Sequence, residues 1–238
     1  MTPQPPCLVT GASRGIGRAV VLALARAQRG AHLVGVARSA EALATLGPEV
    51  AALGGTFEAL SGDLATEPGL LRLLERLPPR LRLGYVLLNA GALVNKPFVE
   101  TTPSDWQHTF AVNVLGQAEL LRQLLLRERV APGAHVLWVS SRAGISGPRK
   151  YPGLSAYSAS KGAVSILTEQ LAEELAPLGI SVNALALGGV QTEMFAEAFP
   201  GAEAPAQPQA VGAYVADFLL TGHRHYNGKV LPLTRQTP

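Results

Sequence analysis

A tyrosine and a lysine in the second half of the chain could exchange a proton with a substrate. Tyr157 and Lys161 open a predicted helix, and their spacing of four residues places them on one face, about one turn apart. A free tyrosine has a pKa of about 10, and a neighbouring ammonium lowers it. The pair is therefore predicted to supply a general acid for carbonyl reduction.

A tyrosine and a lysine at this spacing are usually a solvent-exposed pair on a helix surface. The surroundings of Tyr157 and Lys161 favour a catalytic role instead. Lys161 is one of only four lysines among 20 basic residues, and it lies among Ala, Ser and Gly. The strand predicted before this helix ends in Ser140 and Ser141, either of which could polarise a substrate carbonyl with its hydroxyl.

A glycine-rich turn near the start of the chain predicts a site for a phosphorylated cofactor. Gly11, Gly15 and Gly17 lie between a predicted strand and a predicted helix, in the spacing G-x-x-x-G-x-G. Glycines in this context let the backbone approach a pyrophosphate and place it at a helix N-terminus. The alternative is an ordinary turn between a strand and a helix.

The end of the second predicted strand indicates which form of the dinucleotide is preferred. An acidic residue there would bind the ribose hydroxyls of NAD, but this chain has Arg38 and Ser39. Arg38 offers a planar fork for a 2′-phosphate, Arg14 could add a second cation, and Ser39 could donate a hydrogen bond. The prediction is NADP(H) in preference to NAD(H); the alternative is that Arg38 is a plain surface arginine.

Two further strand ends carry candidate cofactor contacts. Asp63 follows the third predicted strand, where it could accept from the adenine amino group or cap the next helix, and both readings stay open. The fourth strand ends in Asn89, Ala90 and Gly91. Small residues there would let a cofactor lie close, and Asn89 could brace the neighbouring strand.

Short apolar strands that alternate with helices would position all of these residues. The predicted strands are Cys7–Thr10, His32–Ala37, Thr56–Leu60, Tyr85–Asn89, His135–Ser140, Ser181–Ala186 and Lys229–Leu233. The predicted helices are Ile16–Arg29, Ala40–Leu53, Pro68–Leu77, Ser104–Val130, Ser155–Leu178 and Gln209–Leu220, with a capping box at Ser104 and Gln107. The alternation predicts an α/β fold, with one parallel sheet covered by helices on both faces.

The composition of the 238 residues excludes several classes of protein. With 47% hydrophobic and 16% charged residues, the chain is neither disordered nor a coiled coil, and the single Cys7 cannot form an internal disulfide. The sequence has no apolar run long enough for a membrane span and no evident secretory signal. The net charge of +3 is spread without a Lys/Arg run. We therefore expect a cytoplasmic protein with no nucleic-acid, membrane or metal partner.

Together, these motifs resemble those of the classical short-chain dehydrogenase/reductases, from Leu8 to about Val230. The matches are the glycine turn from Thr10 to Gly17, the N-A-G motif at Asn89–Gly91, the helix asparagine at Asn113, the active-site serine at Ser141 with Ser140 as alternate, and Y-x-x-x-K at Tyr157 and Lys161. The resemblance implies a single Rossmann-type domain over residues 1–238, with a seven-stranded doubly wound sheet and a short substrate lid around 193–209. It also implies hydride transfer between a nicotinamide and a carbonyl or alcohol carbon.

The resemblance also implies a role for each catalytic residue. Tyr157 would be the acid in reduction and the base in oxidation, and Lys161 would lower its pKa and bind the nicotinamide ribose. Ser141 would position the carbonyl, and Asn113 would hold a water that links Lys161 to solvent, unless it only mends a helix break. The predicted cofactor-binding residues are Gly11, Ser13, Arg14, Gly15, Ile16, Gly17, Arg38, Ser39, Asp63, Leu64, Asn89, Ala90, Gly91, Tyr157, Lys161, Gly188, Val190 and Thr192.

The chain departs from the family pattern at three places. Leu187 replaces a frequent proline after the sixth strand, which makes the following loop less stiff. The segment from Ser141 to Tyr157 is about three residues longer than usual, and the extra length falls in 144–153. We expect Arg149, Lys150 and Tyr151 there to form an exposed basic loop, with a reach to the substrate mouth as the alternative. The C-terminal segment lacks the D-G-G motif that is frequent in the family, so the resemblance does not determine the oligomer contacts of this segment.

The substrate is predicted to be a small, apolar carbonyl or alcohol compound. Met194, Phe195 and Phe199 could form an apolar cover over it, or they could simply pack helices. One alternative is a 3-oxoacyl thioester reductase, although the glutamates at 169, 173 and 174 disfavour an acidic carrier protein. A second is a non-catalytic NADP(H)-binding regulator, and an epimerase or dehydratase acting on a nucleotide sugar is a weaker third. By resemblance, the long helices pair into a homodimer or homotetramer.

Overall fold

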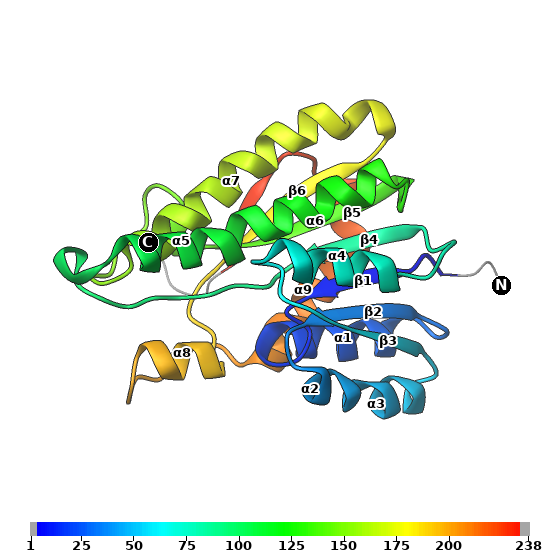
Figure 1. The fold of residues 1–238 in the computed structure, drawn as a ribbon, viewed down its shortest axis with the longest axis horizontal. Coiled ribbons are helices and arrows are strands. Elements are labelled where there is room, and N and C mark those ends of the chain that lie inside the picture. The colour runs from blue at the N-terminus through cyan, green and yellow to red at the C-terminus, as the bar shows by residue number, and fades with distance from the viewer. Residues whose placement is uncertain (1–3, 234–238) are drawn as a thin grey trace.

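Seven parallel strands form the centre of the molecule in the computed structural model, which describes residues 4–233 (Figure 1). The order across the sheet is β3-β2-β1-β4-β5-β6-β7, so the chain winds outward in both directions from β1. The strands are β1 Cys7–Thr10, β2 His32–Ala37, β3 Thr56–Ser61, β4 Leu83–Leu88, β5 Val130–Ser141, β6 Ser181–Leu187 and β7 Val230–Leu233. This architecture confirms the predicted doubly wound α/β fold.

Helices cover both faces of the sheet. The α-helices are α1 Gly15–Ala27, α2 Ala40–Ala44, α3 Leu46–Ala52, α4 Glu67–Arg76, α5 Pro103–Phe110, α6 Gly116–Leu126, α7 Ser155–Leu175, α8 Glu193–Ala198 and α9 Pro208–Thr221. Short helical turns are η1 Phe98–Glu100, η2 Ala111–Leu115, η3 Arg142–Gly144, η4 Ala176–Leu178 and η5 Gly222–Arg224. One buried core joins the sheet to α4, α6 and α7, and a second joins it to α1, α2, α3 and α9. Strands buried on both faces explain why the sequence shows continuous apolar runs without alternation.

Two of the predicted helices are interrupted. The stretch Ser104–Val130 consists of α5, a π-helical segment η2 and α6, and Asn113 lies inside the π-helical segment. It ends at Leu126, and Val130 already belongs to β5. The stretch Ala40–Leu53 is divided into two helices at Thr45. Apolar periodicity survives such breaks, which is why the sequence pattern does not reveal them.

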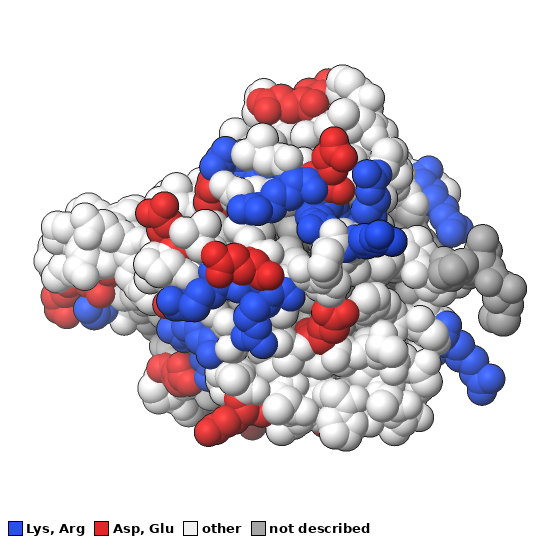
Figure 2. Space-filling model, turned by 45° about the vertical axis from the view of Figure 1, so that its right-hand side comes forward, with Lys and Arg blue, Asp and Glu red and all other residues white. Residues whose placement is uncertain are grey.

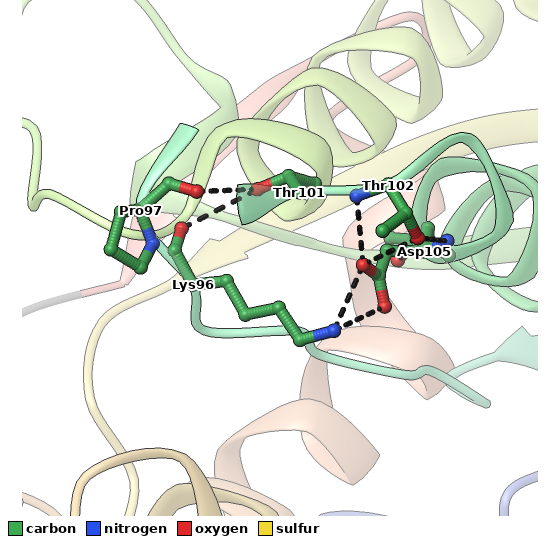
Figure 3. A network of polar contacts seen from close by, with 6 residues as sticks. Lys96, Pro97, Thr101, Thr102 and Asp105 are labelled. Atoms are coloured by element: carbon green, nitrogen blue, oxygen red, sulfur yellow. Dashed lines mark hydrogen bonds and ion pairs between the residues drawn. The ribbon is translucent and has the colours of Figure 1, made fainter. Parts of the chain in front are cut away.

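The predicted capping box at Ser104 and Gln107 is wrong by two residues. The helix is capped by Thr102, whose hydroxyl accepts from the Asp105 N–H at 3.2 Å, while the Asp105 carboxylate accepts from the Thr102 N–H at 2.9 Å (Figure 3). Pro103 occupies the first helical position, where its missing N–H costs nothing, and this fixes the start. The Lys96 ammonium donates to both Asp105 oxygens at 2.9 Å, and these contacts together hold the pKa of that carboxyl at about 2.

Charged side chains of both signs are interspersed on the face shown in Figure 2. Arg82, directly before β4, is paired with Glu128, and Arg122 on α6 is paired with Glu119. Within residues 4–233, no helix has the length and apolar character needed to cross a bilayer.

Candidate active site

The glycine turn after β1 forms a cradle at the N-terminus of α1. Gly11 has a φ of +67°, and a Cβ on Gly17 would lie 2.2 Å from the Gly11 carbonyl oxygen, so both positions require glycine. The side chain of Arg14, which precedes the helix, does not cap it. The first N–H groups of α1 therefore stay available for an anion, which fits the pyrophosphate of a dinucleotide.

A buried polar network braces the ends of β1 and β4. The Asn89 side-chain amide donates to the Thr10 carbonyl at 2.9 Å, as expected for an asparagine that ties the two strands together. The Thr10 hydroxyl accepts from the Asn89 N–H at 2.8 Å and donates to Gln117 Oε1 at 2.8 Å, and Gln117 donates to the Ala90 carbonyl. Gln117 was not predicted as a site residue. Its signal was a polar side chain four residues after Asn113, on the same side of the helix.

Asn113 ties the segment after β4 to helix α7. Its Oδ1 accepts from the Ala92 N–H at 2.7 Å, and its Nδ2 donates to the Ala92 carbonyl at 3.0 Å and to the Ser160 hydroxyl at 2.8 Å. The side chain is fully buried, and its backbone carbonyl accepts from Gln117 at 3.2 Å. Its polar atoms are thus engaged in bracing the π-helical segment against its neighbours, and the water-holding role stays a prediction.

The three predicted catalytic side chains lie together at the end of β5 and the start of α7. The hydroxyl of Ser141 is hydrogen-bonded to that of Tyr157, and Ser141 Oγ also accepts from the Ala143 N–H at 3.2 Å. Lys161 is 3% exposed. Its Nζ donates to the Val139 carbonyl at 2.7 Å and lies 5.9 Å from the centroid of the Tyr157 ring.

The two candidate serines have different surroundings. Ser140 is buried, and its hydroxyl donates to the Lys161 carbonyl at 3.0 Å and lies 3.0 Å from the Ser165 hydroxyl. Ser140 therefore anchors β5 to α7. Ser141 is the serine that contacts the Tyr157 hydroxyl, which favours Ser141 as the residue that meets a substrate.

Burial dominates the protonation of both titrating groups. It raises the pKa of Tyr157 above its usual value, while the hydrogen bond from Ser141 acts in the opposite direction. It lowers the pKa of Lys161 to about 8. Lys161 is not among the groups that shift the Tyr157 pKa in this arrangement, and the expectation that it lowers this pKa stays a prediction. The ammonium donates to the Val139 carbonyl and lies over the Tyr157 ring, 5.9 Å from its centroid, instead of bonding to the phenolic oxygen.

A cleft of about 290 Å³ lies over the glycine turn and the ends of β2 and β4. It is lined by Arg14, Arg38, Gly91, Ala92, Leu93, Asn95, His108, Met194, Glu197 and Ala198. Arg38 is exposed to this space, whereas Arg14 is paired with Glu197 at 3.1 Å. Asn95 Nδ2 donates to the Ala198 carbonyl at 2.7 Å, which closes one side of the cleft with α8. Asn95, His108 and Glu197 come from three separate segments, and none of them was predicted as a site residue, although Glu197 lies within the expected lid.

Ser39 and Asp63 each make a local backbone contact at a strand end. The Ser39 hydroxyl accepts from the Ala42 N–H at 3.2 Å and caps α2, which leaves its proton free to be donated. Asp63 Oδ1 accepts from the Ala65 N–H at 2.9 Å, and Thr66 is the residue that caps α4. The helix-capping alternative for Asp63 is therefore wrong, and the adenine contact stays a prediction.

The segment after β6 is held from both sides. Leu187 is buried and continues the strand, because it pairs with Leu233 of β7, so the missing proline is replaced by sheet pairing. Gly188 donates to the Leu233 carbonyl at 3.1 Å, Val190 forms an isolated bridge to Ala206, and Thr192 caps α8. The Phe195 and Phe199 rings pack on each other with centroids 5.0 Å apart, so of the three apolar candidates only Met194 lines the cleft.

Comparison with known proteins decides the family. The sequence profile described as short chain dehydrogenase matches residues 6–203. The chain belongs to the short-chain dehydrogenase/reductase family. Hydroxynaphthalene reductase arp2 of Aspergillus fumigatus is 33% identical over 192 residues, which cover 80% of this chain and 68% of that protein. The 3-oxoacyl-[acyl-carrier-protein] reductase of Synechocystis is 32% identical over 191 residues, which cover 79% and 74%.

Solved structures of the family have the same fold. A short-chain dehydrogenase/reductase mutant from Serratia marcescens matches with a TM-score of 0.84 and 26% identity, over 96% of both chains. A short-chain dehydrogenase from Burkholderia cenocepacia in complex with NADP matches with a TM-score of 0.81 and 29% identity, over 95% of both chains. This chain is therefore a member of an oxidoreductase family whose substrates carry CH–OH or C=O groups.

Proposed function

We propose that the protein is an NADP(H)-dependent reductase of small, largely apolar carbonyl compounds. The observation that carries the proposal is the contact between the Ser141 and Tyr157 hydroxyls, beside the buried Lys161. A non-catalytic regulator of the same fold would have no need of this proton-transfer group. NADPH, when bound, supplies the hydride.

The residues of the chain can divide the remaining work among them. Ser141 would donate a hydrogen bond to the substrate carbonyl oxygen, and the Tyr157 hydroxyl would give that oxygen its proton as negative charge develops. An ordinary phenol is protonated at neutral pH, and burial raises the pKa of Tyr157 further. The protonated form is the one that can give a proton to the carbonyl oxygen in reduction. Lys161 would bind the nicotinamide ribose and hold positive charge beside the phenol.

The preference for a phosphorylated cofactor is supported by the charges around the cleft. Arg38 is exposed at the end of β2, where an NAD-specific site would have a carboxylate. Arg14 lines the same cleft, but its pairing with Glu197 makes it the weaker contributor. The related Burkholderia cenocepacia structure contains NADP, which is consistent with this assignment.

Substitution of Arg38 tests the cofactor preference. Arg38→Ala is expected to lower kcat/KM with NADPH about 10- to 100-fold and to leave kcat/KM with NADH nearly unchanged, because only the 2′-phosphate loses a charge-assisted partner. Arg29→Ala, which removes an exposed arginine beyond the end of α1, is the control and should change neither value. Equal losses with both cofactors, or a wild-type enzyme that uses NADH as well as NADPH, would contradict the assignment.

A screen of NADPH oxidation tests the substrate class. The panel contains ketones, aldehydes, diketones, fused aromatic ketones and short 3-oxoacyl thioesters, since relatives are named hydroxynaphthalene reductase and 3-oxoacyl-[acyl-carrier-protein] reductase. We expect the apolar ketones to be turned over best, because Leu93 and Met194 are the large apolar side chains of a cleft whose other long side chains are charged or polar and lie beside the predicted phosphate site. Preference for thioesters would favour the acyl reductase alternative. Micromolar NADPH binding with no turnover of any compound would favour the regulator.

We also propose that residues 193–209 act as a substrate lid and that the protein is a homodimer or homotetramer. The Asn95 and Glu197 contacts place α8 against the cleft, as a lid requires.

The proposed oligomer is supported by exposed apolar side chains on η2, α6 and α7. These are Leu115, Leu126 and Ile166, which are 61%, 65% and 67% exposed, and apolar side chains at this exposure suit a helix-pairing interface. Light scattering on the purified protein measures the assembly.

A further inference from the structure

The extended loop between β5 and α7 packs directly on the catalytic helix. A Cβ on Gly144 would lie 2.4 Å from the Lys161 carbonyl carbon and 2.6 Å from the Gly162 nitrogen. The loop backbone therefore touches the helix backbone at the turn that carries Lys161. One residue earlier in the loop, the Ala143 N–H donates to Ser141 Oγ. The turn 142–145 thus lies between the serine and the lysine of the candidate site.

The ammonium of Lys150 closes over this turn. Its Nζ donates to the carbonyl of Ala143 at 3.0 Å, to that of Arg142 at 3.4 Å and to that of Ile145. An ammonium has three protons to donate, and here each can meet one carbonyl of the turn. The basic loop is therefore exposed as expected, but this lysine turns back on the backbone instead of extending into solvent or to the substrate mouth.

We propose that Lys150 is a positioning residue for Ser141. Without it, three carbonyl dipoles converge with no cation between them, and the turn would relax. Because the Ala143 N–H is bonded to Ser141 Oγ, this relaxation would shift the serine relative to the Tyr157 hydroxyl. Small displacements of reacting groups are costly, and about 1 Å can lower a rate about 100-fold.

This inference rests on the proposed function, since it concerns the geometry of the same proton-transfer group. The test is a double-mutant cycle between Lys150→Met and Ser141→Ala, with kcat, KM and the NADPH dissociation constant measured for each variant. Lys150→Met keeps the apolar stem and removes the three donors. In the wild-type background it should lower kcat about 10-fold and change the NADPH dissociation constant less than twofold.

In the Ser141→Ala background, Lys150→Met should have less than a threefold effect on kcat, because the residue acts through the serine. Lys150→Arg keeps a charge and several donors, so its kcat should lie closer to wild type than that of Lys150→Met. This variant also keeps the test available if Lys150→Met folds poorly. Arg149→Met, which removes the adjacent exposed cation, is the control and should match wild type.

An equal loss of kcat in both backgrounds would overturn the inference, because a general weakening of the loop does not depend on Ser141. Wild-type kcat in Lys150→Met would overturn it as well. Both outcomes leave the proposed function standing as long as Tyr157→Phe is inactive. If Tyr157→Phe is active, the proposed function itself fails.

Discussion

Replacing Tyr157 by Phe is expected to lower turnover about 1,000-fold or more while leaving NADPH binding within about threefold of wild type. The variant removes only the phenolic oxygen, which is the proposed proton donor, and general acid catalysis contributes about 100- to 10,000-fold in rate. Since the substitution keeps the ring, the packing around Lys161 is preserved. Turnover of the best carbonyl found in the substrate screen gives the rate, and quenching of protein fluorescence gives the NADPH affinity.

The stability of this variant should change little. Ser141 loses one hydrogen-bond partner but keeps the Ala143 N–H, so the cost is about 1 kcal/mol or less. Tyr151→Phe is the matched control, because Tyr151 is 57% exposed in the loop between β5 and α7 and has no proposed part in the chemistry. A Tyr157→Phe protein that keeps more than a tenth of wild-type turnover would show that another group supplies the proton.

The elements that carry the site could be predicted because their signals are local. Strands such as His32–Ala37 are buried on both faces, so each is a short apolar run, and the polar residue after it marks the edge of the sheet where a site forms. Tyr157 and Lys161 were predicted from their spacing, and the pair Ser140 and Ser141 from its position at the end of a strand, whereas the choice of Ser141 came from the family resemblance. The residues that produce each of these signals lie close together in the sequence.

The contacts that shape the cleft could not be predicted because they join segments far apart in the chain. Arg14 and Glu197 are 183 residues apart, and Asn95 and Ala198 are 103 apart. Nothing in either local sequence specifies the partner. The contacts of Lys150 could not be predicted for a different reason. A basic residue in a glycine-rich loop indicates only exposure, and the three acceptors of Lys150 are backbone carbonyls, which any sequence would supply.

Replacing Lys161 by Met is expected to lower turnover strongly and at the same time to remove a free-energy penalty on folding at neutral pH. Turnover should fall about 100-fold or more, because the proposed ribose contact and the positive charge beside Tyr157 are both lost. The effect on stability has a different cause. Lys161 is 3% exposed, and burial without a described carboxylate partner lowers its pKa from 10.5 to about 8. A shift of this size corresponds to about 3 kcal/mol of penalty on the charged form.

The sign of the pH dependence follows from where the proton is held. Between about pH 8 and 10.5 the unfolded chain keeps a proton on Lys161 that the folded protein has released, so wild-type stability rises with pH through this window. Below pH 8 the folded protein carries the whole penalty, which the methionine variant lacks. Loss of the donor to the Val139 carbonyl offsets part of that gain, at about 1–3 kcal/mol independent of pH.

The titration of Lys161 is therefore measured by how the difference in free energy of unfolding between wild type and Lys161→Met changes with pH. From pH 7 to pH 9.5 wild type should gain about 2 kcal/mol in free energy of unfolding relative to Lys161→Met, as measured by denaturant titration at each pH. Every other titrating group is common to both proteins and cancels. Lys229→Met removes an exposed lysine and should show no such change. A difference that stays constant with pH would mean that Lys161 titrates normally, and that the site holds a full ammonium beside Tyr157 throughout this range.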